Sequence, residues 1–198
     1  MLEEKVQEKI SQKIKGRLVK HLVDTTGLSL AVTPFFALME TTVRHMSDWE
    51  SFKTRLWGTG LGYAGNAFLY SGGRDLTRWL FRINDKTNEF IQLAADLAYS
   101  AAFNTALHYA LYSHTTSQSH AELTLSALTA GGVGAAVGPI GGYAIDLYRD
   151  LTGIKPCERK LYPRRLRELD TKGKRKALGY ISAALAAATA LVYVLTPN

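Results

Sequence analysis

Charged residues are spread unevenly along this chain of 198 residues. Five stretches contain no lysine or arginine and at most two acidic residues each: 22–43, 56–73, 90–121, 123–145 and 177–198. A helix that spans a bilayer needs about 20 mostly apolar residues. Each of the five stretches has about that length, so the pattern predicts transmembrane helices.

The alternative is a soluble helical bundle whose helices are rich in alanine and glycine. Helices on the surface of a soluble protein carry a charge on their outer face every turn or two. The uninterrupted gaps of 18 residues (56–73) and 23 residues (123–145) disagree with a solvated face. We therefore favour an all-α, polytopic membrane bundle, in which the many Gly, Thr, Ser and Ala residues of the spans face neighbouring helices.

Basic residues separate by side when the five stretches are taken as spans. Of the 24 lysines and arginines, 21 lie before the first span, in the second connector or between Arg149 and Lys176, and only 3 lie in the first connector. The positive-inside rule then places the amino terminus in the cytoplasm. We expect a multi-pass protein of the cell inner membrane without a cleavable signal peptide, because the first twenty residues alternate charge with isolated aliphatics.

The sequence RDLT occurs twice, at residues 74–77 and 149–152, each time after a glycine-rich apolar run. Asp24 precedes Arg74 by 50 residues, and Asp96 precedes Arg149 by 53. We interpret the core, residues 22–152, as two copies of one helical hairpin, 22–77 and 90–152. Both copies begin and end inside, so the repeats are expected to be parallel, about an axis along the membrane normal.

Three segments lie outside this core. Residues 1–21 carry an aliphatic side chain at every fourth position with lysines between, which predicts a basic amphipathic helix on the inner leaflet. Residues 153–176 form a basic cytoplasmic tract, and residues 177–198 are expected to form a fifth span. RNA binding by the tract is disfavoured, because Tyr162 is its only stacking ring and no known RNA-binding module is present.

Helix breakers and amides fall at similar depth in the predicted spans. At a rise of about 1.5 Å per residue, they lie about 12–15 Å from the inner surface, near the midplane. The set consists of Pro34, Asn66, Asn104 and Pro139. Proline frees a backbone carbonyl one turn earlier, so the set predicts a polar substrate site. The alternative is that the prolines are ordinary for membrane helices and the asparagines pair with each other.

Ionisable groups within the spans are candidates for proton coupling. Glu40 lies about 24 Å and His108 about 18 Å from the inner surface by the same rise, and Asp96 lies close to that surface. A desolvated carboxyl or imidazole can titrate near neutral pH. The alternative for a lone histidine, and the more frequent case, is a hydrogen bond between two helices. Asp24 and Asp146 are expected to form structural ion pairs at the inner surface, with Arg74 or Arg149 as partners.

Gly134, Gly138 and Gly142 follow each other at intervals of four residues. This pattern lets two helices approach closely, within a chain or between chains, and predicts helix packing and a homo-oligomer. The lone Cys157 supplies neither a disulfide nor a cysteine metal site within one chain. His114 and His120, six residues apart in a connector, are weak evidence for a metal. We expect no cofactor and no catalytic activity.

Four blocks of the chain resemble the bacterial L-alanine exporter family of small inner-membrane proteins: VDTTGLSLAVTPFFALMETTVRHMSDWESFKTRL, YSGGRDL, AADLAYSAAFN and GPIGGYAIDLYRDL. They extend from residue 23 to 151, in the family's order and spacing. The resemblance implies a four-helix exporter of alanine that is driven by the proton gradient and self-associates through a glycine motif matching Gly138 and Gly142. The amino-terminal helix, the basic tract and the fifth span depart from the family.

The sequence thus predicts a secondary exporter of L-alanine or another small neutral amino acid, with lipids and copies of itself as partners and no nucleic acid. A zwitterionic substrate needs an acceptor for its ammonium and donors for its carboxylate, which freed carbonyls and amides at the midplane supply. The alternative is a non-transporting scaffold or lipid organiser assembled through its glycines. In that case polar residues at the midplane are replaceable and the glycines are not.

Overall fold

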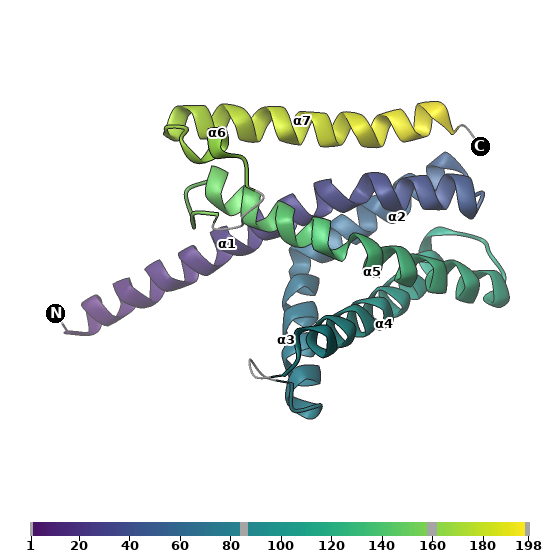
Figure 1. Ribbon diagram of the computed structural model, residues 1–198, viewed down its shortest axis with the longest axis horizontal. Coiled ribbons are helices and arrows are strands. Elements are labelled where there is room, and N and C mark those ends of the chain that lie inside the picture. Colours follow the sequence, from purple (N-terminus) through teal and green to yellow (C-terminus); the bar gives the residue numbers. More distant parts are fainter. Residues whose placement is uncertain (1, 84–86, 158–161, 197–198) are drawn as a thin grey trace.

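The computed structural model describes residues 2–83, 87–157 and 162–196, which form helices joined by short turns and contain no strand. Figure 1 shows the arrangement. The helices are α1 (Leu2–Leu38), α2 (Asp48–Leu61), α3 (Ala67–Leu80), α4 (Glu89–Thr115), α5 (His120–Leu151), α6 (Arg164–Arg167) and α7 (Thr171–Leu195), with π-helical turns η1 (Met39–Val43) and η2 (Gly62–Asn66).

Helix α1 is one continuous element of 37 residues. It joins the predicted surface helix, residues 1–21, to the predicted first span without a break, and its amino-terminal part projects from the bundle (Figure 1). Pro34 lies inside α1 and Pro139 inside α5, and both helices continue through them. The described helices therefore do not end at the prolines.

The turns after α1 and α4 each lead into a helix with the same amino-terminal cap. Ser47 accepts a hydrogen bond from the Glu50 backbone while the Glu50 side chain accepts one from the Ser47 backbone, and Ser119 and Glu122 repeat the arrangement before α5. Such a capping box satisfies two backbone donors that a helix start leaves unpaired. The Ser-x-x-Glu signal fixes where α2 and α5 begin, and so how the chain reverses at both turns.

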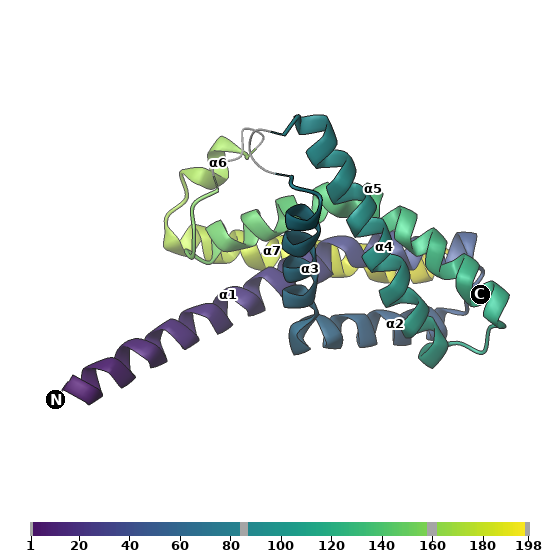
Figure 2. The same cartoon turned by 90° about the horizontal axis from the view of Figure 1, so that it is seen from below.

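The charge-free stretch 56–73, expected to be one span, is divided at Gly65. Gly65 has φ of 120°, a conformation open mainly to glycine. On one side of this kink α2 runs beside α1, and on the other α3 turns crosswise to both, as the perpendicular views of Figures 1 and 2 agree. The second copy of the predicted repeat has no such break, because α5 is one continuous helix from His120 to Leu151.

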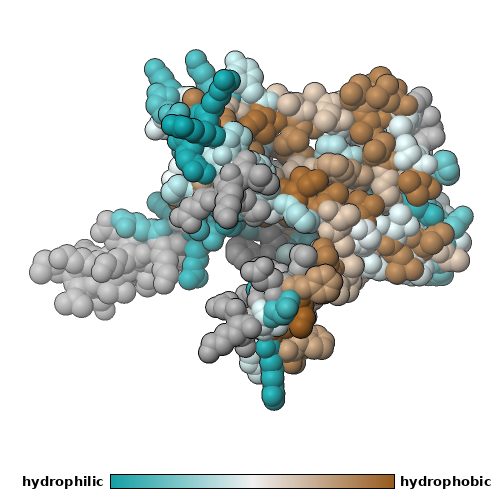
Figure 3. Space-filling view, in the orientation of Figure 1, coloured by the Kyte–Doolittle hydropathy of each residue, from teal (hydrophilic) through white to brown (hydrophobic). Residues whose placement is uncertain are grey.

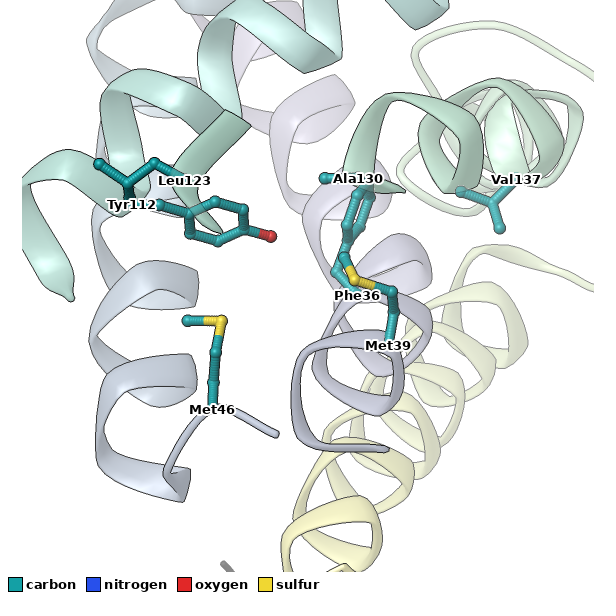
Figure 4. Close-up of a cluster of buried hydrophobic side chains, with 7 residues drawn as sticks. All are labelled: Phe36, Met39, Met46, Tyr112, Leu123, Ala130 and Val137. Atoms are coloured by element: carbon teal, nitrogen blue, oxygen red, sulfur yellow. The ribbon is translucent and has the colours of Figure 1, made fainter. Parts of the chain in front are cut away.

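Helices α1, α4 and α5 pack around a small core. Figure 4 shows it at the end of the bundle where the chain turns after α1 and α4, with Phe36 and Met39 facing Met46 and Tyr112. A Cβ atom at Gly134 of α5 would lie 2.6 Å from Asn104 Cγ of α4, so any larger residue would force the Asn104 side chain or the helices to shift. A second core joins α5 and α7 to the tract between them: Leu147, Tyr148, Leu151, Cys157 and Tyr162.

Three of the described helices are long and apolar enough to cross a membrane: Lys15–Val43, His120–Leu151 and Thr171–Leu195. Their lengths and composition agree with the predicted all-α membrane protein, whereas the arrangement of five spans is not confirmed. Large apolar side chains cover much of the surface, while hydrophilic atoms gather at the end where α6 and the start of α7 lie (Figure 3).

Candidate functional site

Glu40 is a completely buried carboxyl in the π-helical turn η1 that ends α1. Its oxygens accept hydrogen bonds from Ser51 Oγ at 2.7 Å and from Tyr112 Oη at 2.9 Å, and Oε1 forms a salt bridge with Arg55. We call these four residues the Glu40 cluster.

Helix α2 supplies Ser51 and Arg55, one turn apart on the face toward α1 and α4. The guanidinium also lies 5.0 Å from the centre of the Phe36 ring, and the arginine side chain is only 11% exposed. Arg55 Nε is buried and has no hydrogen-bond partner among the described residues. The arginine thus has one carboxylate partner and a spare donor.

Helix α4 supplies Tyr112 and, one turn earlier, His108. The His108 ring stacks on Phe36 at 4.6 Å between centroids and lies 5.5 Å from the Tyr112 ring. Its Nδ1 is hydrogen-bonded to the Asn104 carbonyl oxygen at 2.8 Å, while Nε2 is buried and the part of the chain that the structure describes offers it no partner. The Phe36 ring is therefore common to the histidine and to the guanidinium of Arg55.

Helix α2 is inverted relative to a helix of a soluble protein. Its fully buried side chains, Ser51 and Thr54, are polar, and Thr54 hydrogen-bonds Thr115 of α4 at 2.6 Å. Its exposed side chains are large and apolar: Trp49, Phe52, Leu56 and Trp57. A polar interior with an apolar exterior is typical of a helix surrounded by lipid. The Glu40 cluster thus lies on the polar, inward side of a helix with a lipid-compatible surface.

Helix α7 closes the cluster from the other side. Tyr193 Oη lies 3.1 Å from Ser51 Oγ, and Thr196 Oγ1 donates to Thr41 Oγ1 at 2.8 Å. Thr41 follows Glu40 in η1 and is buried. The carboxyl-terminal end of α7, which the family resemblance did not cover, therefore contacts the residues around Glu40 directly.

The opposite end of the bundle carries further ion pairs. Arg149 of α5 binds both oxygens of Asp24 in α1, with Nε 2.6 Å from Oδ1, and lies 3.7 Å from Asp146. Asp150 accepts hydrogen bonds from Tyr162 Oη and from Lys174 Nζ, the latter at 3.0 Å. The Asp150 contacts fasten the basic tract and the start of α7 to α5.

The four predicted substrate-binding residues occupy different surroundings. Asn104 lies in the contact between α4 and α5 and donates to the Ser100 carbonyl oxygen at 2.8 Å, whereas Pro139 is exposed on α5. Asn66 precedes α3 at the kink, and Pro34 is half-buried in α1. Among the described residues, no hydrogen bond links any two of the four.

The other residues predicted from the sequence also lie in different surroundings. The side chains of Arg74 and Asp96 lie outside those that the structure describes. Gly134 packs against Asn104, whereas Gly138 is exposed. Among described residues no group of three His, Cys, Asp or Glu side chains could hold a metal ion, and His120 hydrogen-bonds Tyr109 at 3.2 Å.

Reasoning from the sequence missed Arg55, Ser51, Tyr112 and Tyr193 as parts of a site. A signal for Arg55 was present, because it is one of only three basic residues in the first connector, although the charge pattern places that connector in water. Tyr193 had no local signal, since its role depends on the docking of α7.

Comparisons with known proteins identify no relative of this chain. No protein-family model, no curated protein and no solved structure matches the chain. The likeness to the alanine exporters stays a prediction that rests on the sequence blocks alone.

Proposed function

We propose that this chain is a secondary transporter that exports L-alanine or another small neutral amino acid across the cytoplasmic membrane in exchange for protons. The observation that supports this proposal is the buried pair of Glu40 and Arg55 at the end of a helix able to cross a membrane. Ionisable side chains within membrane helices are costly, and they commonly mark substrate pathways and proton relays.

The pair has the two charges that an amino-acid zwitterion requires. A substrate carboxylate would pair with the Arg55 guanidinium, whose Nε has no partner, and a substrate ammonium with the Glu40 carboxylate. Binding then exchanges one internal ion pair for two pairs with the substrate. The aromatic rings of Phe36, His108 and Tyr112 pack beside the pair, and such an apolar wall suits a small side chain such as a methyl.

Proton exchange follows from competition at Glu40. A protonated Glu40 is neutral and no longer holds the ammonium, so a proton and the substrate exclude each other at this carboxyl. Mutually exclusive binding is the relation that an antiporter needs to drive export with an inward proton gradient. The unpartnered Nε2 of His108 is a second group of the predicted coupling set beside the cluster.

We base the site on the Glu40 cluster and not on the predicted slab of Pro34, Asn66, Asn104 and Pro139. Asn104 bonds within its own helix and Pro139 is exposed, which gives the slab little support. The glycines likewise favour packing inside the chain: a Cβ at Gly131 would lie 2.8 Å from the Ala101 carbonyl oxygen, and one at Gly141 2.6 Å from Leu28 Cδ1.

Transport from proteoliposomes tests the proposal. Vesicles with the full chain and loaded with labelled L-alanine should lose it when the other side is acidified, and Glu40→Gln should slow this efflux about 100-fold. Glu168→Gln is the matched control, because Glu168 forms an exposed pair with Arg164. Detergent size-exclusion profiles establish that the variants remain folded.

Two results would count against an exporter. Wild-type vesicles that move no amino acid would leave the scaffold as the better account, and Glu40→Gln vesicles as fast as wild type would remove the cluster from the mechanism. A scaffold further predicts that substitution at exposed glycines of α5, such as Gly132 and Gly138, changes the oligomer while Glu40→Gln does not.

A further inference from the structure

Helix α3 separates apolar from polar side chains along its length. At about 100° per residue, Leu69, Leu76 and Leu80 share one face, and they are 69%, 55% and 60% exposed. Arg78 lies on the opposite face, and Trp79, 71% exposed, flanks the leucines. The inner side of α3 contacts α4, where Tyr99 Oη donates to the Tyr70 carbonyl oxygen at 3.0 Å.

This helix is unsuited to cross a bilayer. Its 14 residues extend about 21 Å, against about 30 Å of hydrocarbon. It contains Arg74, Asp75 and Arg78. Helix α3 therefore does not reach its apolar surroundings by spanning the bilayer. Its exposed leucines need an apolar partner in another orientation of the helix.

The depth of α3 is set by the kink before it. Tyr63 in η2 is fixed to α1 twice: its carbonyl oxygen is hydrogen-bonded to His21 Nε2 at 3.1 Å, and its hydroxyl lies 2.6 Å from Thr26 Oγ1. Between these two contacts on α1 lies Asp24, which pairs with Arg149. Helix α3 thus begins at the level of the ion pairs that mark the basic end of the bundle.

Its direction is set by the same kink. The long axes of α1, α5 and α7 run broadly together in both views, and α3 leaves crosswise to them (Figures 1 and 2). Because the candidate spans are parts of α1, α5 and α7, a helix that runs crosswise to them is oriented along the plane of the membrane.

We propose that α3 is an interfacial helix that lies in the anionic lipid of the inner leaflet, with Leu69, Leu76 and Leu80 among the acyl chains and Arg78 toward the headgroups. Apolar exposure continues past the helix at Phe81 and at the start of α4, where Phe90 is 77% exposed. Amphipathic helices with basic polar faces and Trp or Leu on the other face bind such surfaces. Anionic lipid is the occupant because the described parts of the basic tract, residues 153–157 and 162–176, lie at the same end of the bundle, where Lys174 pairs with Asp150.

Nitroxide depth measurements test this orientation and do not depend on transport. In a Cys157→Ala background, labels at L69C, L76C and L80C are compared in vesicles of phosphatidylcholine with phosphatidylglycerol. The proposal expects one shallow depth for all three labels, because they share a face of a helix in the membrane plane. A spanning helix would separate L69C from L80C by about 16 Å.

Helix α7 provides the matched control. Labels at the exposed positions 184 and 191, as A184C and L191C, should differ in depth by about 10 Å if α7 crosses the bilayer. A steady gradient along α3 would overturn the proposal, and so would α3 labels that lipid-dissolved oxygen does not reach, which would indicate a protein partner. Equal depth at lower oxygen exposure in pure phosphatidylcholine would support the anionic preference, whereas equal exposure in both lipids would refute it.

Fluorescence of Trp79 gives a second measurement. With Trp49→Phe and Trp57→Phe, both at exposed positions, only Trp79 reports. Brominated lipids should quench it most when bromine is near the headgroup. Strongest quenching by bromine at the chain ends, or no quenching, would contradict an interfacial position.

Discussion

Tyr193 of α7 is the hydrogen-bond donor to Ser51 of α2, with 3.1 Å between the two oxygens. Ser51 has one hydroxyl hydrogen, and it donates this to Glu40 Oε2 at 2.7 Å. Ser51 must therefore accept from Tyr193. Glu40 and Ser51 are fully buried while Tyr193 is half-buried, so the three groups form a chain from an enclosed carboxyl toward the surface.

This chain predicts how a proton reaches Glu40. Transfer from water to Tyr193, from Tyr193 to Ser51 and from Ser51 to Glu40 moves one proton inward while each hydroxyl loses one and gains one. Tyr193→Phe removes the chain, so protonation of Glu40 after a pH jump should slow about 100-fold. Infrared spectroscopy measures it through the carboxyl band that Glu40→Gln abolishes.

Two controls separate this relay from the docking of α7. Thr196→Val removes the hydrogen bond from Thr196 to Thr41 in η1, and Tyr180→Phe removes an exposed phenol from the same helix as Tyr193. In both variants Glu40 should be protonated at the wild-type rate. If Glu40 is protonated at the wild-type rate in Tyr193→Phe as well, the proton takes another route. The other charged or titratable groups that act on Glu40 or Tyr193 are Arg55, Tyr112 and Asp48, and Arg44 acts on Tyr112.

Alanine exchange distinguishes the relay from the transport site itself. Exchange of internal for external alanine needs no net protonation, so Tyr193→Phe should retain it while losing efflux driven by a pH gradient. Equal loss of both activities would indicate a structural defect. The vesicle assay thus gives a readout that a destabilised helix would not reproduce.

The Glu40 and Arg55 pair should show strong coupling in a double-mutant cycle. Removing one partner of a buried ion pair leaves an uncompensated charge and costs about 3–5 kcal/mol. Arg55→Gln should therefore lower the unfolding temperature strongly, and addition of Glu40→Gln should recover part of the loss. Additive losses in thermal unfolding would show that the two charges do not stabilise each other. The reference is the exposed pair of Arg164 and Glu168, measured in the same cycle with Arg164→Gln and Glu168→Gln.

Gly134 and Gly132 make a matched pair on α5. A Cβ at position 134 would lie 2.6 Å from Asn104 Cγ, whereas nothing lies within 4 Å of one at position 132. Gly134→Ala should cost about 1–3 kcal/mol, as overpacking does, and Gly132→Ala should be neutral or stabilising, because alanine favours helix. Detergent-based thermal unfolding compares them, and equal effects would contradict the close contact of α4 with α5.

The helical class and the apolar character of the chain could be predicted from the spacing of charges, because a charge-free run of membrane length is typical of a helix in lipid. The kink at Gly65 could not be predicted, since glycine is common throughout these runs. Only the contacts of Tyr63 with α1 show which glycine turns the chain. The charge pattern therefore predicts one span over residues 56–73, while the structure divides this run at η2, between α2 and α3.

The candidate site was predictable only in part. Glu40 stands out as an acid in an apolar run, whereas the charge pattern assigns Arg55 to a loop because it does not show where α2 begins. The Ser47-x-x-Glu50 capping box held that information. Tyr193 lies 142 residues from Ser51, and no local pattern reports a contact across that separation.

Tyr162 should make stability fall at alkaline pH. It lies outside the candidate spans, and burial, followed by its hydrogen bond to Asp150, raises the pKa of its phenol well above the usual value. The unfolded chain loses this proton first, above about pH 10, so the contribution is complete below that pH and lost as the pH rises. Tyr162→Phe should be less stable than wild type near neutrality, because Asp150 loses a donor, and should lose less stability between about pH 9 and 11. Thermal unfolding measured against pH reports both effects. Tyr180→Phe, at an exposed position, should keep the wild-type slope of stability against pH. If Tyr162→Phe also keeps the wild-type slope, this phenol does not hold the basic tract to α5.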